Sequence, residues 1–178
     1  MRGVHIHPLV VRFGDCDPAG IVYFPRFFDF FHDAMETWFS AHLGVAYAQV
    51  VTDRKIGFPA VHSEADFKVP CAFGESIAVE LRVAKLGRSS IGLDYLVRGA
   101  DGGLRLTGAT TSIAATHQRE QHSRKDQPPS HGGPYRLLHC IPLSICLAAG
   151  APCAALGEVV GRSRLPAGYP KDKPCRFD

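Results

Sequence analysis

Apolar side chains recur at every third or fourth position in residues 25–44, as they do along one face of a helix. Pro25 suits the first helical turn, and Gly44 suits the position where a helix ends. Phenylalanine is unusually frequent in and beside this segment, so we expect the helix to bury more than one face, wrapped by a curved sheet. The positions with helical spacing are Phe27, Phe31, Met35 (or Ala34) and Trp38.

Alternation of apolar and polar residues predicts one strand before this helix and four strands after it. Residues 5–13 carry a β-branched cluster and lead into a turn-forming run. The later segments alternate with a period of two and are separated in part by glycine-containing turns. We therefore expect an α+β fold in which the aromatic helix packs on one side of an antiparallel meander. The four later strands are expected at residues 64–69, 77–84, 91–97 and 104–116.

The composition indicates a globular domain followed by a different kind of tail. Of the 178 residues, 46% are hydrophobic, which is enough to bury a core and excludes collagen-like, coiled-coil and fully disordered chains. Residues 1–118 carry 11 Lys+Arg and 12 Asp+Glu, whereas residues 119–178 carry 9 and 5, so the positive net charge of +3 arises in the tail. We expect one domain over residues 1–118 and an atypical tail over residues 119–178. A charge this small predicts no nucleic-acid partner.

The tail is rich in Pro, Arg, Cys, Gly and His and shows neither a period nor a second hydrophobic core. Two hypotheses explain it: a disordered or partner-binding extension, or a change of reading frame in the gene, and we favour the second. Four of the six Cys lie in the tail, and their spacing lacks the C-x-x-C pairs of a structural zinc site.

Two apolar runs bear on the cellular compartment. Residues 9–11 are too short for the hydrophobic region of a signal peptide, so we expect no export signal and reduced thiols. Residues 141–156 contain two prolines and fall short of the roughly 20 residues that a membrane span needs. We expect a cytoplasmic protein without a membrane partner.

The most informative chemistry lies between the first strand and the helix. Asp17 precedes Pro18, which favours an extended backbone at Asp17, and Gly20 lets the main chain approach a ligand closely. Unpaired N–H groups at the start of the helix, near Phe24, present a positive dipole end. An aspartate is ordinarily ionised at neutral pH and can act as a nucleophile or as a base toward water. Taken alone, however, Asp, Pro and Gly are ordinary turn residues.

The run Phe13-Gly14-Asp15-Cys16-Asp17-Pro18-Ala19-Gly20-Ile21-Val22-Tyr23-Phe24-Pro25 resembles the signature of the 4-hydroxybenzoyl-CoA thioesterase family of hotdog-fold proteins. The resemblance covers about residues 5–118 and implies a hotdog fold, with the long helix held by a curved antiparallel sheet. It implies that Asp17 is the catalytic carboxylate, which attacks the thioester carbonyl or activates water. It also implies that the main-chain N–H near Phe24 polarises that carbonyl, with Gly20 and Tyr23 at the substrate.

Other residues near this run receive weaker assignments. Asp15 is interpreted as a turn or capping acid, and Cys16, between two acids, as inert packing. His32 replaces the acid expected in the aromatic-acyl enzymes of the family, and it faces either the acyl pocket or a surface ion pair. Asp29, His32 and Glu36 lack convincing further partners as metal ligands, and no metal is predicted. We also predict no cofactor.

Coenzyme A carries phosphates that call for basic groups near the pocket mouth. Arg88, Ser89 and Ser90 resemble the region that contacts the nucleotide in relatives, although a turn between strands is usually solvated and charged anyway. Phe58 and Pro59 line the acyl end in the family pattern, but from sequence alone they are ordinary loop and core residues. The resemblance implies a homodimer or homotetramer, with the active site between subunits.

These observations favour hydrolysis of an acyl-CoA thioester to a free acid and CoA, with an aromatic acyl group of the 4-hydroxybenzoyl kind. The alternatives are a short-chain acyl-CoA or acyl-carrier-protein thioesterase, and a hotdog protein that binds acyl groups without hydrolysing them. A dehydratase of related fold would need a paired Asp and His, and no such motif stands out.

Overall fold

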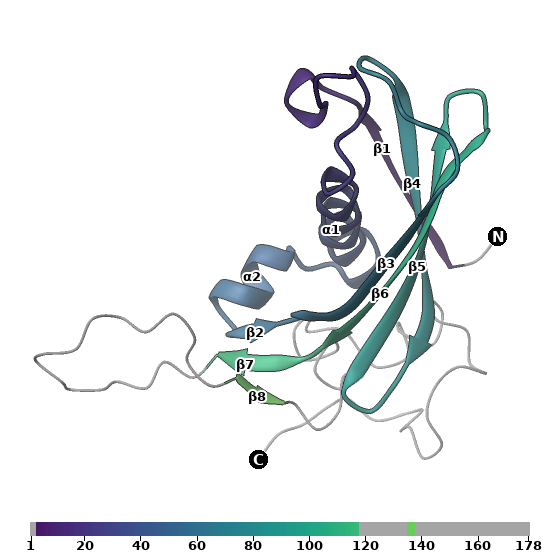
Figure 1. Cartoon of the computed structure of the whole chain (residues 1–178). Helices are drawn as coiled ribbons and strands as arrows, with labels where there is room; N and C mark the ends of the chain where they lie inside the picture. Colours follow the sequence, from purple (N-terminus) through teal and green to yellow (C-terminus); the bar gives the residue numbers. More distant parts are fainter. Residues whose placement is uncertain (1–2, 118–134, 138–178) are drawn as a thin grey trace, which may run out of the picture.

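The computed structural model describes residues 3–117 and 135–137 (Figure 1). Strand β1 is followed by helices α1 and α2 and then by the remaining strands, and short helical turns η1 and η2 flank α1 on its two sides. The elements in chain order are β1 (Val4–Val10), η1 (Phe13–Asp15), α1 (Arg26–Trp38), η2 (Phe39–Leu43), α2 (Tyr47–Thr52), β2 (Ile56–Gly57), β3 (Ala60–Phe67), β4 (Ser76–Leu86), β5 (Ser90–Gly99), β6 (Leu104–Ile113), β7 (Ala115–His117) and β8 (Tyr135–Leu137).

The long aromatic helix is confirmed. Helix α1 begins directly after Pro25, continues through the π-helical turn η2 and stops at Gly44, whose φ of 68° is the left-handed conformation that glycine adopts readily. More than one face is buried, as expected from the excess of phenylalanine. Its buried residues and those of η2 are Phe27, Phe30, Phe31, Ala34, Met35, Trp38, Phe39 and Leu43.

The strands pair in an order that differs from the predicted meander. The main sheet has the order β1-β4-β5-β6-β3, and all its pairs are antiparallel. Only β4, β5 and β6 form a meander, because the connection after β3 crosses the end of the sheet and leaves β3 paired with β6 (Figure 1). Alternation identifies strands but not their partners, so the prediction of sequential pairing was wrong.

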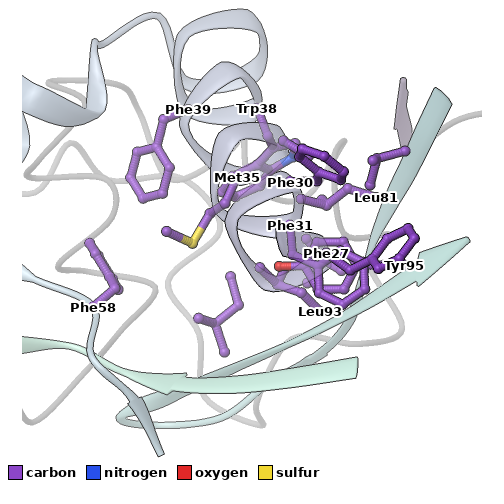
Figure 2. Close-up of a cluster of buried hydrophobic side chains, with 14 of the residues drawn as sticks. Phe27, Phe30, Phe31, Met35, Trp38, Phe39, Phe58, Leu81, Leu93 and Tyr95 are labelled. Atoms are coloured by element: carbon purple, nitrogen blue, oxygen red, sulfur yellow. The ribbon is translucent and has the colours of Figure 1, made fainter. Parts of the chain in front are cut away.

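Helix α1 lies on one face of this sheet, and aromatic rings fill the space between them (Figures 1 and 2). The ring of Phe31 stacks on Tyr95 of β5 with a centroid distance of 4.2 Å and an interplanar angle of 10°. Gly108 of β6 pairs with Tyr95, and a Cβ at Gly108 would lie 2.4 Å from the Phe31 ring. The missing side chain therefore makes room for Phe31. On the opposite face, Arg98 and Glu80 are joined by an ion pair of 2.9 Å.

Three features were not predicted. Helix α2 has only six residues, too few for a helical period to be recognised. Strand β3 starts at Ala60 and ends at Phe67, so Val69 lies outside it, and most of its side chains are exposed because β3 is an edge strand. The short strand β8 lies within the predicted tail and pairs with β7; the rest of the tail falls outside the described residues. Among those described, no helix is long and apolar enough to cross a membrane.

Candidate active site

The loop between β1 and α1 folds back on itself as a small hairpin. The N–H of Asp17 donates to the carbonyl of Ile21 (2.9 Å), and the N–H of Gly20 donates to the carbonyl of Asp17 (3.0 Å). Gly20 has a φ of 77°, so this turn needs a residue without a Cβ. The hairpin therefore holds Asp17 close to the chain that enters α1.

A second segment clamps this hairpin from the side. The N–H of Val22 donates to the carbonyl of Cys71 (2.9 Å), and the N–H of Phe73 donates to the carbonyl of Gly20 (3.1 Å). Cys71 is buried, and burial raises the pKa of its thiol to about 11, so this cysteine is a packing residue and not a thiolate nucleophile.

Asp15 ties the hairpin to the helix. Its side chain is buried, and one carboxylate oxygen accepts the N–H of Arg12 (2.8 Å). The other oxygen accepts two N–H groups of Arg26, the first residue of α1, at 3.1 and 2.7 Å. A paired, hydrogen-bonded carboxylate of this kind is stable away from water. Asp15 is thus a capping and bracing acid, as predicted.

Cys16 lies between the two acids with part of its surface exposed. Partial burial raises the pKa of its thiol, and the negative charges of Asp15 and Asp17 raise it further. The thiolate is therefore disfavoured, in agreement with the prediction that Cys16 is inert.

Asp17 and Phe24 present two unused groups beside the start of α1. One oxygen of the Asp17 carboxylate accepts the N–H of Ala19 (2.9 Å), and the other has no partner among the described residues. The N–H groups of Tyr23, Arg26, Phe27 and Phe28 are all bonded to carbonyls, whereas the N–H of Phe24 has no partner in the described part of the chain. A free carboxylate oxygen and a free amide donor therefore lie at the two ends of one short loop.

A cavity of about 520 Å³ extends beside α1, in the size range of small-molecule sites. It lies between α1, α2 and the ends of β3 and β6, and its lining includes the predicted residues His32, Phe58 and Pro59. Residues at helical spacing on α1 form one wall, among them Phe28 and Met35. Figure 2 shows Met35, Phe39 and Phe58 grouped on one side of the core, with Phe31 and Tyr95 on the other.

His32 takes both of the roles considered for it. It lines the cavity, and its Nε2 lies 3.4 Å from a carboxylate oxygen of Glu36. Its ring also meets the ring of Tyr47 edge to face, at a centroid distance of 5.5 Å. Burial raises the pKa of Tyr47, and Glu36 adds to this, while a backbone hydrogen bond from Phe58 opposes it. Tyr47 is therefore a neutral hydroxyl at the cavity wall.

Polar residues of the cavity were missed from sequence. Tyr95, Thr110 and Ser112 turn toward α1 from β5 and β6, and Lys55 lies at the rim after α2. Thr110 and Ser112 stand two residues apart, so both occupy inward positions of β6 where an apolar residue is usual. That break in the apolar pattern was the available signal.

Arg88, Ser89 and Ser90 lie far from Asp17 within one chain. Arg88 and Ser89 lie in the turn between β4 and β5, and Ser90 begins β5; the N–H of Gly87 donates to the carbonyl of Ser90 (2.7 Å). Val10, which leads into the Asp17 loop, pairs with Ser76 at the opposite end of β4. The length of β4 separates the two ends by roughly 30 Å. Figure 1 shows the β4–β5 turn and the loop before α1 at opposite ends of the sheet.

No group of three or more His, Cys, Asp or Glu side chains in residues 3–117 and 135–137 is placed to hold a metal ion. The groups that the site offers are a carboxylate, a backbone donor and a cavity with aromatic and hydroxyl walls.

Comparison with known proteins gives similar sequences and folds. A 1,4-dihydroxy-2-naphthoyl-CoA hydrolase of Synechococcus elongatus is 38% identical over 87 residues, which are 48% of this chain and 63% of that protein, so the chain spans less than two thirds of its length. A hydrolase of the same name from Synechocystis sp. is 29% identical over 110 residues, 61% of this chain and 78% of that protein.

Two solved structures share the fold. A gentisyl-coenzyme A thioesterase is 27% identical with a TM-score of 0.59, covering 63% of this chain and 89% of that chain. The 4-hydroxybenzoyl CoA thioesterase from Pseudomonas sp. strain CBS-3 is 22% identical with a TM-score of 0.65, and the match covers 83% of this chain and 99% of that chain. At this identity the similarity is evidence for the fold alone. The predicted hotdog fold is thereby confirmed. The family model of the thioesterase-like superfamily matches residues 11–131, and the chain belongs to that superfamily.

Proposed function

We propose that this protein hydrolyses CoA thioesters of hydroxylated aromatic acids. The observation that carries the proposal is that one loop presents both an Asp17 carboxylate oxygen and a Phe24 N–H, each without a partner among the described residues, in a chain of the thioesterase-like superfamily. Both groups were expected from the resemblance, and the hydrogen bonds around them explain why they are free.

The two groups suit the charge changes of thioester hydrolysis. Asp17 either attacks the carbonyl carbon or takes a proton from the attacking water, and in both routes the carbonyl oxygen becomes negative. The Phe24 N–H and the positive end of α1 stabilise that oxygen, where a fixed donor is worth about 3 kcal/mol. Collapse of the tetrahedral intermediate breaks the carbon–sulfur bond and releases CoA as the thiolate, which is then protonated. When water is the attacking group, this step gives the free acid. When Asp17 attacks, it leaves an acyl–Asp17 anhydride, which water then hydrolyses to the free acid and the Asp17 carboxylate.

The cavity favours an aromatic acyl group. Phe28 lines the cavity one helical turn beyond Phe24, about 6 Å along the axis, so an acyl group whose carbonyl meets the Phe24 N–H extends directly beside α1. Phe28, Met35 and Phe58 offer flat and adaptable apolar surfaces to a ring. The relatives named for 1,4-dihydroxy-2-naphthoyl-CoA support a two-ring acyl group, with 4-hydroxybenzoyl and gentisyl groups as one-ring candidates.

A substrate panel tests this function. CoA release from 1,4-dihydroxy-2-naphthoyl-CoA, 4-hydroxybenzoyl-CoA, acetyl-CoA and an acyl-carrier-protein thioester is followed with a thiol reagent. We expect the best aromatic substrate to exceed acetyl-CoA in kcat/KM by about a hundredfold or more. A preference for acetyl or carrier-linked substrates would replace the proposal with one of those thioesterases. Tight acyl binding without thiol release would identify a binding protein.

The exposed edge of the sheet suggests that a second copy completes the site. Among the described strands, β3 pairs with β6 alone, and its Val61 and Phe67 are 59% and 48% exposed. A long edge strand with apolar side chains is a template for pairing. The start of β3 lies at the Arg88 end of the sheet, and its end at the Asp17 end. Antiparallel pairing of two β3 strands would therefore bring Arg88 of each copy toward Asp17 of the other.

Substitution at this edge tests the assembly. We expect the protein to have at least twice the chain mass in light scattering, as a dimer or a tetramer. Val61→Lys should shift the measured mass toward that of the monomer and lower kcat/KM, because it places a lysine charge at the edge where two β3 strands would pair. Val10→Lys alters a similarly exposed valine (52%) on β1, the opposite edge, and should leave the mass unchanged. A wild-type monomer with full activity would contradict this arrangement.

A further inference from the structure

Three side-chain hydroxyls form the floor of the cavity, between its aromatic walls. They belong to Tyr95 on β5 and to Thr110 and Ser112 on β6, and all three residues line the cavity. Because Thr110 and Ser112 are two positions apart on one strand, they point to the same side of the sheet, which faces α1. We call these three residues the hydroxyl floor.

Tyr95 is fixed in place by its surroundings. Only 2% of its surface is exposed, and its ring stacks on Phe31. Its hydroxyl lies 3.2 Å from the Thr110 hydroxyl, and either oxygen can donate in this bond. Burial raises the pKa of Tyr95 to about 12, with the Thr110 hydrogen bond opposing the shift, so the hydroxyl stays neutral and keeps its proton. The Tyr95–Thr110 pair still has unused donor and acceptor capacity.

Of the three residues of the hydroxyl floor, Ser112 gives the strongest indication of a ligand. It is 3% exposed, and its hydroxyl has no hydrogen-bond partner among the described residues. A buried hydroxyl without a partner is unfavourable, so such groups are normally satisfied by protein, water or ligand. Ser112 lines the cavity and lies on the face of β6 that is turned toward α1, so its hydroxyl is placed at the cavity space. An occupant of the cavity can therefore bond to it.

We propose that the hydroxyl floor recognises a ring hydroxyl of the acyl group and so selects hydroxylated over unsubstituted aromatic thioesters. The inference rests on the proposed thioesterase function and adds the residues that recognise the hydroxyl group of the substrate. A phenolic hydroxyl can donate to Ser112 and accept from Thr110 or Tyr95, which are neutral and free to orient their protons. The ring itself lies against Phe28, Met35 and Phe58, which contact any aromatic acyl group alike.

Paired substrates and isosteric variants test the inference. The measured quantity is the ratio of kcat/KM for 1,4-dihydroxy-2-naphthoyl-CoA to that for 2-naphthoyl-CoA. Each lost hydrogen bond to a neutral group should lower this ratio by up to about tenfold in Ser112→Ala and in Thr110→Val. Thr111→Val is the matched control, because Thr111 points to the other face of β6 and should leave the ratio unchanged.

The outcomes separate this inference from the proposed function. A wild-type ratio near one, or a ratio unchanged in both Ser112→Ala and Thr110→Val, would overturn the recognition role while leaving the thioesterase intact. If no thioester is hydrolysed, the proposed function fails. Comparing the binding affinities of 1-naphthol and naphthalene then tests the hydroxyl floor alone. In that case, naphthol binding that is stronger than naphthalene binding and weakened by Ser112→Ala supports the hydroxyl floor, and equal binding of both contradicts it.

Discussion

Replacing Asp17 with asparagine should lower kcat/KM for the best aromatic thioester by about a thousandfold or more while leaving the fold intact. Asparagine has the same shape, and its amide oxygen can still accept the N–H of Ala19 that now bonds to the carboxylate. It cannot attack the carbonyl or take a proton from water. The change therefore removes the proposed chemistry and preserves the hairpin, which circular dichroism and thermal unfolding would confirm.

Asp94→Asn is a suitable control for this experiment. Asp94 is exposed on β5, and the same change of charge there should alter activity by less than about twofold. Hydrolysis by Asp17→Asn at near the wild-type rate would remove Asp17 from the mechanism. A loss of folding in the variant would instead give Asp17 a structural role.

Replacing Phe31 with alanine should reduce the free energy of unfolding by about 3 to 5 kcal/mol. Phe31 is 1% exposed, stacks on Tyr95 and fills the space left by Gly108, so its loss opens a cavity that the rigid β5–β6 pair cannot close. Urea unfolding followed by fluorescence and circular dichroism would measure the change. A loss this large approaches the whole stability of a domain, so the variant should be measured with added sulfate, which stabilises folded proteins.

Phe73→Ala provides the comparison, because Phe73 is exposed and makes one edge-to-face contact with Phe13. Its removal should lower the free energy of unfolding by less than about 1 kcal/mol. If Phe31→Ala had an equally small effect, the side chains between α1 and the sheet would be able to repack. The interpretation that the missing side chain at Gly108 makes room for Phe31 would then be wrong.

The local pattern of the chain predicted the elements well and their arrangement less well. The spacing of Phe27, Phe31 and Trp38 depends only on helix geometry, and the alternation in β4 and β5 depends only on strand geometry. The pairing of β3 with β6 depends on contacts between distant segments, which alternation does not encode. Helix α2 was missed because it spans fewer than two turns.

The candidate site shows the same division. Asp17 and Phe24 lie in one continuous run, so a motif could point to both of them. The hydroxyl floor is assembled from two strands, and its residues become neighbours only through the β5–β6 register. Arg88 was predicted near the substrate, but the length of β4 separates it from Asp17 of its own chain, so a role for it depends on a second copy.

The bonds around Asp15 have a consequence for how this protein can change over evolutionary time. The carboxylate of Asp15 anchors the loop to Arg26, and main-chain bonds from Cys71 and Phe73 hold its other side, so none of these restraints involves a cavity side chain. Residues of α2, β3 and β6 can therefore be exchanged to admit a different acyl group without moving Asp17. Under the proposed function, the same Asp17 loop would then act on different acyl groups, and the cavity residues would determine which acyl group is accepted.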